Sequence, residues 1–210
     1  MGITIYMVEV REDDTQIYIK MLNRGDANLE KVYNKNYFFS LGLHVVDEES
    51  KDDKNTNKNS DVLETFTEGS YIHFIIEKTK KNATTMSFVS YLDEIKKTPN
   101  LNPLTVFESG IDYNILESIT NDVCSCLEYI KLKGMQLIEK KKEQIYVVNG
   151  RFIILTEDIV LFDEKNVPNE ESILKILSEI CGINYARGED HFKPFIYGTF
   201  LYNKLKSLID

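Results

Sequence analysis

Apolar and polar residues alternate along several short stretches near the start of the chain, which predicts β-strands with one buried face. The clearest case is residues 16–22, where Ile17, Ile19 and Met21 lie on one face and polar residues on the other. A polar turn separates this stretch from residues 3–10, so the two segments predict a hairpin. Two further strands are expected at residues 37–46 and 71–77. Together these strands predict an N-terminal antiparallel sheet.

A different period follows in the second half, where apolar residues recur every three or four positions from residue 116 to residue 130. This spacing predicts an amphipathic helix, and Asp112 is placed to cap its first turn. The pattern weakens at Gly134 and resumes at residues 137–138, so we expect one long helix over residues 112–142 with a kink at the glycine. Glycine inside a helix costs about 1 kcal/mol relative to alanine, which favours the kink.

Three short apolar runs follow this helix, at residues 145–148, 152–155 and 159–162. Asn149-Gly150 joins the first two, and this dipeptide readily adopts the positive φ angles of a two-residue hairpin turn. The runs therefore predict a three-stranded antiparallel meander. Because they are apolar almost throughout, both faces of the meander are expected to be buried, one of them by the preceding helix.

The remaining segments complete an α+β fold. We expect three further helices, at residues 86–97, 169–181 and 195–208. Residues 47–61 are charged and rich in asparagine, which is typical of a solvated loop. The segment before Pro103 is the best candidate linker. We therefore divide the chain into a β-rich subdomain, residues 1–103, and a subdomain of helix, meander and helices, residues 104–210.

Composition narrows the class of protein. With 42% hydrophobic residues among 210, the chain can bury a sizeable core. No stretch approaches the roughly 18 apolar residues of a membrane span, and the N-terminus lacks the pattern of a secretory signal, so we expect a cytosolic protein with no membrane partner. Cys124, Cys126 and Cys181 fit free buried thiols better than disulfides. Abundant lysine, asparagine and isoleucine indicate an AT-rich genome, as in a bacterium, a mobile element or a virus.

The formal net charge of -9 disfavours a general nucleic-acid binder, yet the lysines are not evenly spread. They gather in three clusters, namely Lys78, Lys80 and Lys81; Lys96 and Lys97; and Lys131, Lys133, Lys140, Lys141 and Lys142. Clusters that met on one face would attract phosphates, which keeps a nucleic-acid partner open as an alternative. Solvated ends of helices and strands are the commoner explanation.

Residues 53–64 resemble the calcium loop of an EF-hand, because side chains with oxygen atoms occupy its ligand positions from Asp53 to Glu64. Lys58 stands where that loop needs glycine, and no helical pattern precedes Asp53. Such spacing arises readily in a segment this rich in asparagine and aspartate, so we expect no bound calcium.

Asp163-Glu164-Lys165 resembles the D/E-x-K triplet of restriction-endonuclease-like nucleases, which hold Mg²⁺ and activate water. Those enzymes place a companion carboxylate on a neighbouring strand. Asp158 is only five residues upstream, in a predicted turn, and Glu143 is the other candidate. A polar turn that closes a strand explains the same residues, so a magnesium-dependent nuclease is kept as an alternative.

A polar cluster lies in the most aromatic part of the chain and comprises Tyr185, Arg187, Glu189, Asp190, His191, Phe192 and Lys193. His191 beside a carboxylate has the composition of an acid/base pair. Charged residues interleaved with tyrosine and phenylalanine are also typical of interface hot spots. We therefore predict an interaction surface in this segment and treat catalysis by His191 as the weaker reading.

The other cysteine and histidine candidates do not predict a metal site. Cys124 and Cys126 would point about 200° apart on a helix, so we expect core residues rather than ligands, and His44 and His73 have no paired ligand nearby. The sequence also lacks a nucleotide-binding loop, a nucleophile elbow and a paired-histidine zinc motif. We therefore expect an interaction or regulatory module of inhibitor or adaptor type that binds a protein partner, without a catalytic site or cofactor of its own.

Overall fold

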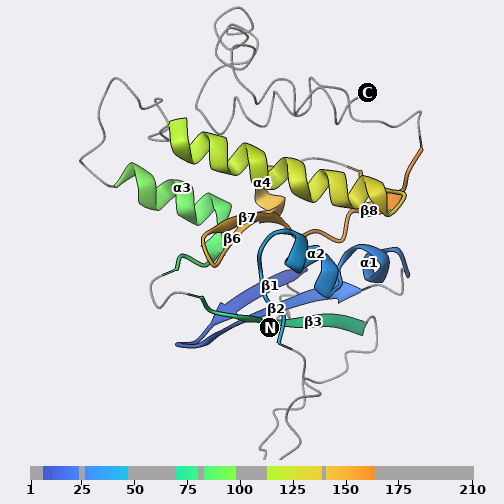
Figure 1. The fold of residues 1–210 in the computed structure, drawn as a ribbon, viewed down its shortest axis with the longest axis horizontal. Coiled ribbons are helices and arrows are strands. Elements are labelled where there is room, and N and C mark those ends of the chain that lie inside the picture. The colour runs from blue at the N-terminus through green and yellow to red at the C-terminus, as the bar shows by residue number, and fades with distance from the viewer. Residues whose placement is uncertain are drawn as a thin grey trace, which may run out of the picture.

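A long helix, α4 (Tyr113–Leu132), runs across the molecule, and the described residues also form three small antiparallel sheets (Figure 1). The structure is a computed structural model, and it describes residues 7–23, 27–46, 70–79, 83–97, 113–138 and 141–163. The predicted loop at 47–61 and the two predicted C-terminal helices lie outside these ranges. Helices and antiparallel sheets together confirm the α+β class.

The first sheet consists of β1 (Val8–Glu12), β2 (Gln16–Asn23) and β3 (Ser70–Glu77), with β2 in the centre. Ile17, Ile19 and Met21 are buried on its inner face, as the alternation predicted. The turn between β1 and β2 is stabilised by Asp13, whose carboxylate accepts backbone N–H groups of Thr15 and Gln16 at 2.7 Å each. These bonds favour the charged carboxylate and lower the pKa of Asp13 to about 2. A hairpin and the strand predicted at residues 71–77 are therefore confirmed, but the first strand spans Val8–Glu12 rather than residues 3–10, and residues 3–6 lie outside the described ranges.

Residues 37–46 do not form the predicted strand. They begin within α2 (Lys35–Ser40), which follows α1 (Ala27–Val32), and only Val45 forms an isolated bridge, to Ile76. Asn34 caps α2 because its side chain accepts the N–H of Asn36 at 2.9 Å, and Gly42 follows its end with φ +74°. Tyr37 and Phe38 are buried, as the apolar run suggested, but they belong to this helix and not to a strand.

The long helix also ends earlier than predicted, at Leu132. Gly134 adopts φ +70° and reverses the chain into β5 (Met135–Leu137). A left-handed residue is the ordinary way to end a helix, so this glycine stops α4 rather than kinking it. Lys142, predicted as the last residue of the long helix, instead begins the separate short helix η2 (Lys142–Gln144).

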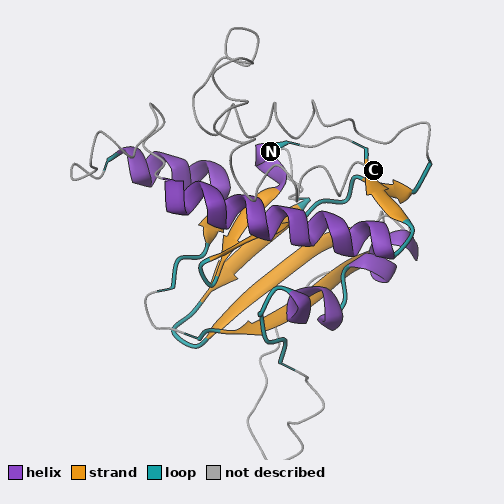
Figure 2. Cartoon of the chain, turned by 45° about the horizontal axis from the view of Figure 1, so that its top comes forward, coloured by secondary structure: helices purple, strands orange, loops and turns teal. Residues whose placement is uncertain are grey.

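The second sheet contains β4 (Met86–Ser87), β6 (Ile145–Val148) and β7 (Arg151–Ile154), in the order β4-β6-β7. The short predicted helix follows β4 as α3 (Phe88–Lys96). Asn149 and Gly150 have φ 55° and 78°, which confirms the two-residue hairpin. The strands β6 and β7 are almost completely buried, with α4 packed on β7 as Figure 2 also shows.

The third strand of the predicted meander leaves this sheet. β8 (Ile159–Leu161) pairs with β5, not with β7, and the two strands form a separate antiparallel ribbon. Beyond the strands, the N–H of Ile138 bonds to the carbonyl of Asp158 and that of Phe162 to the carbonyl of Gly134. The meander prediction was therefore wrong, because the reversal at Gly134 supplies a nearer partner strand.

One hydrophobic core connects the described parts of the two predicted subdomains. It contains residues from β2, α1 and α2 as well as from α4, β6 and β7. The Tyr37 hydroxyl donates to the carbonyl of Ile154 at 2.7 Å, and the Thr156 N–H donates to the Tyr33 hydroxyl at 3.1 Å. Within the described ranges, no helix is long and apolar enough to cross a membrane.

Candidate functional site

Asp122, in a row of polar residues along α4, positions the hairpin of the second sheet. Asn114, Ser118 and Asp122 are spaced four residues apart and therefore lie along one side of the helix. The Asp122 carboxylate accepts the buried N–H of Phe152 at 3.0 Å and forms an ion pair with Arg151 at 2.8 Å. Only 7% of the Asp122 side chain is exposed, so it fixes β7 against the helix from inside the protein.

The other side of the same hairpin is held by the segment before β4. The N–H of Gly150 donates to the carbonyl of Thr84 at 2.9 Å, and the N–H of Asn149 donates to the Thr85 hydroxyl at 3.2 Å. The Asn149 amide also donates to the carbonyl of Glu77 at 3.1 Å. The hairpin turn is therefore fixed both by α4 and by the segment that connects the two sheets.

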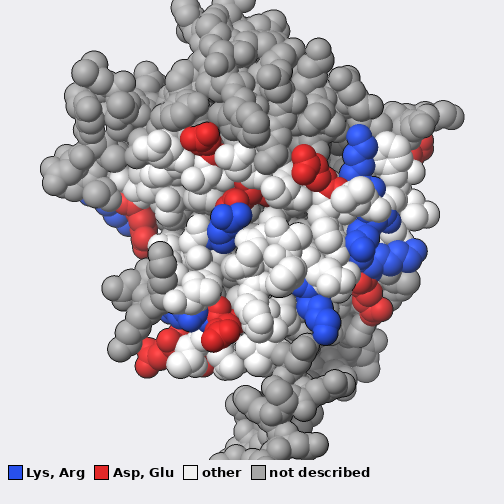
Figure 3. Space-filling model, viewed as in Figure 1, with Lys and Arg blue, Asp and Glu red and all other residues white. Residues whose placement is uncertain are grey.

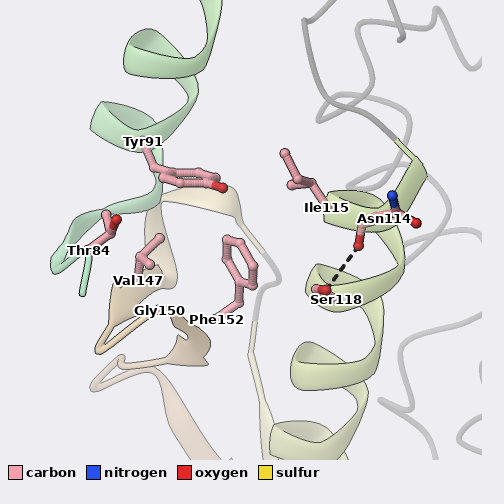
Figure 4. A pocket seen from close by; sticks show the side chains of 8 residues that line it. All are labelled: Thr84, Tyr91, Asn114, Ile115, Ser118, Val147, Gly150 and Phe152. Carbon is pink, nitrogen blue, oxygen red and sulfur yellow. Dashed lines mark hydrogen bonds between the residues drawn. The ribbon is translucent and has the colours of Figure 1, made fainter. Parts of the chain in front are cut away.

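A pocket of about 280 Å³ opens between α3, α4 and this hairpin (Figure 4). Its lining residues come from all three elements and are Thr84, Tyr91, Asn114, Ile115, Ser118, Val147, Gly150 and Phe152. The rings of Tyr91 and Phe152 lie edge to face, with centroids 5.4 Å apart. In Figure 4, Asn114, Ile115 and Ser118 come from α4, opposite Tyr91 and Val147. We call this the hairpin pocket.

The hairpin pocket is suited to binding rather than to acid/base chemistry. None of the described residues that line it is charged, a histidine or a cysteine. The Ser118 hydroxyl donates to the carbonyl of Asn114 at 2.9 Å, as is common for serine in a helix, and no base lies beside it in that lining. Aromatic walls with a few polar groups are typical of ligand pockets.

A second hollow, of about 790 Å³, lies on the β5–β8 ribbon. It is lined mainly by residues of the ribbon and its ends, namely Gln136, Leu137, Ile138, Val160, Leu161, Phe162 and Asp163, with Asn28 from α1. Three of the large apolar side chains are exposed: Ile138 by 60%, Leu161 by 61% and Phe162 by 37%. We call these three residues and Val160 the ribbon surface.

Gln136 lies beneath the ribbon surface and is 7% exposed. Its side-chain oxygen Oε1 is buried and has no hydrogen-bond partner in the described structure. A buried acceptor that is left unpaired costs about 1–3 kcal/mol. The hollow therefore contains both exposed apolar side chains and an acceptor without a donor.

Two described carboxylates of the predicted nuclease site lie beside the ribbon, whereas the alternative companion Glu143 lies on η2 and is exposed. Asp158 and Asp163 lie beyond opposite ends of β8. At about 3.3 Å per residue, an extended chain separates these positions by about 16 Å. Asp158 is exposed and lies 3.5 Å from the Gln144 amide. The described residues contain no group of three or more histidines, cysteines or carboxylates able to hold a metal ion.

Several predicted site residues fall outside the described ranges. These are Lys165 of the nuclease triplet, all of the interaction segment from Tyr185 to Lys193, including His191, the calcium-loop resemblance at residues 53–64, Cys181, and Lys80, Lys81 and Lys140 of the lysine clusters. The predictions that rest on them therefore stay predictions.

The structure shows which described lysines of the predicted basic clusters are paired and which are exposed. The side chain of Lys78 is nearly buried and forms an ion pair with Glu12 at 2.9 Å, so its positive charge is paired within the protein. Lys131 and Lys133 are exposed at the end of α4, and Lys133 lies over the ring of Tyr129. Figure 3 shows basic side chains gathered mostly at the right edge of that view, with acidic side chains beside them.

The cysteines and histidines lie where a structural role predicts. Cys124 and Cys126 are both buried within the hydrophobic core, which confirms them as core residues. Burial raises the pKa of the Cys126 thiol to about 11, and burial also raises the pKa of Tyr33 and Tyr37 beside it. His73 is exposed on β3, and His44 lies 3.7 Å from the carboxylate of Glu77.

The sequence reasoning missed both hollows. Asn114 and Ser118 are exposed polar residues of an amphipathic helix, which is an ordinary pattern and gives no signal for the hairpin pocket. The ribbon surface gave no signal either, because Ile138, Leu161 and Phe162 are residues of the kind that usually form a core.

Comparison with known proteins finds no family model that matches the chain and no similar curated protein.

Proposed function

We propose that this chain is a protein-interaction module that docks a partner protein on the ribbon surface. The observation that carries the proposal is the exposure of Ile138, Leu161 and Phe162 around one hollow. Large apolar side chains that gather on a surface mark interaction sites, whereas apolar residues exposed singly are ordinary. The regulatory role expected from the sequence, as inhibitor or adaptor, belongs to this proposal.

The ribbon surface also indicates the chemistry of its partner. Ile138, Leu161 and Phe162 present apolar side chains to a partner, whereas the Gln136 oxygen is buried and is not presented. A partner segment with apolar side chains would cover these three residues. We therefore infer that the occupant is a segment of another protein that presents apolar side chains.

The proposal is tested by capturing partners from a lysate of the source cell with two aspartate variants. Leu161→Asp places a charge on the ribbon surface, whereas Phe39→Asp places one on α2 at a residue that is 74% exposed. We expect a stoichiometric partner that is captured by the wild type and Phe39→Asp and lost with Leu161→Asp. Equal capture by the two variants would refute the ribbon surface.

A third variant separates the ribbon surface from the segment predicted by sequence. It combines Arg187→Glu, Phe192→Ala and Lys193→Glu. Loss of the partner in this variant alone would assign the interaction to residues 185–193 instead. Light scattering on the purified chain tests a further alternative, a homodimer. A dimer that is lost with Leu161→Asp would identify a second copy of this chain as the occupant and would contradict docking of a different protein.

A further inference from the structure

We propose that the hairpin pocket binds a small, uncharged aromatic ring compound with a hydrogen-bonding edge, of which an aromatic amide is the simplest example. The pocket is formed by α3, α4 and the β6–β7 hairpin and shares no lining residue with the ribbon surface. This inference is therefore independent of the proposed docking function.

The size of the pocket sets the size of the ligand. Its volume is about 280 Å³. An apolar cavity of about 150 Å³ is enough to take up benzene. The hairpin pocket therefore has room for one substituted ring or two fused rings, and it is too small for a dinucleotide or a long peptide.

The walls favour an aromatic ring. Tyr91 and Phe152 already form an edge-to-face pair, at an interplanar angle of 72°, and both line the opening (Figure 4). Ile115 from α4 and Val147 from β6 complete the apolar lining. A ligand ring inserted between these residues would extend the aromatic packing at the preferred centroid spacing of about 4.5–7 Å.

The polar groups of the pocket define an edge for hydrogen bonds. The Ser118 hydroxyl donates its hydrogen bond to the carbonyl of Asn114, so its oxygen can still accept a hydrogen bond from a ligand N–H. The side chains of Asn114 and Thr84 add amide and hydroxyl groups to the lining. A primary amide or a similar donor and acceptor pair on the ring matches these groups.

The absence of charge from the described lining favours an uncharged ligand. An ion buried there would lose water without meeting a counter-charge, which is costly. The charged residues next to the hairpin, Asp122 and Arg151, are paired with each other. The hairpin is also held on both sides, by Asp122 and by Thr84, so the pocket is formed before a ligand arrives and little ordering opposes binding.

Three ring compounds of nearly equal shape test this inference by nuclear magnetic resonance. Benzamide is neutral, benzoate is an anion and benzamidine is a cation. We expect millimolar benzamide to shift the amide signals of Ser118, Gly150 and Phe152, with benzoate and benzamidine at least tenfold weaker. Absence of these shifts, or binding of either ion as tight as that of benzamide, would overturn the proposal.

Two serine variants on α4 provide the matched control. Ser118→Leu fills the pocket, whereas Ser125→Leu changes a residue that does not line it but whose hydroxyl donates in the same way, to Asn121 at 2.8 Å. Benzamide affinity should fall at least tenfold in Ser118→Leu and stay unchanged in Ser125→Leu. An unchanged affinity in folded Ser118→Leu would overturn the assignment. If that variant does not fold, the shifts in the wild type decide the question alone.

Discussion

Asp122 is the residue that most clearly links helix α4 to the rest of the fold. Its carboxylate accepts a buried N–H from Phe152 and pairs with Arg151, while almost none of the side chain reaches solvent. Removing one partner of a buried ion pair costs about 3–5 kcal/mol because the other partner is left uncompensated. Arg151 is half exposed, which lowers the expected cost.

We predict that Asp122→Ala lowers the free energy of unfolding by about 2–3 kcal/mol, mainly because the Phe152 N–H loses its acceptor. The matched control is Glu9→Ala, which removes the carboxylate partner of the exposed Arg11 and should cost less than about 1 kcal/mol. Urea unfolding of the two variants measures both values. Equal losses would show that Asp122 contributes no more than a surface charge.

The buried thiol of Cys126 gives a second prediction at this scale. Its pKa is raised by burial from 9.0 to about 11, so the folded state holds its proton where an unfolded thiol would ionise. A raised pKa stabilises the fold fully below pH 9, and this contribution is lost as the pH rises toward 11. We therefore expect the free energy of unfolding to fall across that range.

Thiol labelling checks the same burial directly. In a Cys181→Ser variant, the remaining thiols Cys124 and Cys126 are both buried. A thiol reagent at about pH 9 should label neither in the folded protein and both after unfolding. Rapid labelling of either thiol before unfolding would contradict their place in the core.

At the scale of elements, Gly134 decides how the second half of the chain folds. Its φ of +70° ends α4 and directs the chain into β5. The left-handed conformation costs an L-residue with a Cβ about 1–2 kcal/mol of free energy, and the cost is smaller for asparagine than for alanine.

We predict that Gly134→Ala lowers the free energy of unfolding by about 1–2 kcal/mol and that Gly134→Asn lowers it by less. Within the described part of the chain, no heavy atom beyond this glycine and its two neighbours lies within 4 Å of a Cβ added here, so the substitution tests backbone conformation. Thermal or urea unfolding ranks the three proteins. An alanine variant as stable as the wild type would be incompatible with a left-handed residue at this position.

The elements show which parts of the fold the sequence could predict. The hairpin at Asn149-Gly150 and the strands β1, β2 and β3 were predictable, because turn chemistry and alternation are local signals. Helix α2 was predictable in principle from Asn34 and Gly42 at its two ends, but its apolar run was taken for a strand.

The partner of β8 was not predictable from local signals. Apolar strands of three or four residues carry no mark that selects one neighbour over another. The choice of β5 depends on where α4 ends and on how the chain then folds back. For the same reason, the hairpin pocket and the ribbon surface became visible only when residues distant in sequence were placed together.

In the whole molecule, the hydrophobic core is shared between the two subdomains that were predicted to divide at residue 103. Apolar residues on both sides of that position belong to one cluster, and Tyr37 and Tyr33 bond to the end of β7. We expect a single cooperative unfolding transition and no stable fold in a fragment of residues 1–103. Circular dichroism of the full chain and the fragment measures this. Two separate transitions, with a folded fragment, would support independent subdomains.

Docking of a partner protein on the ribbon surface is tested most directly by site-specific photo-cross-linking. Benzoylphenylalanine is placed at Leu161 on the ribbon or at Phe39 on α2, both of which are exposed. We expect one discrete cross-linked partner from position 161, none from position 39, and competition by excess wild-type protein but not by Leu161→Asp. The same cross-links from both positions, or none from position 161, would contradict it.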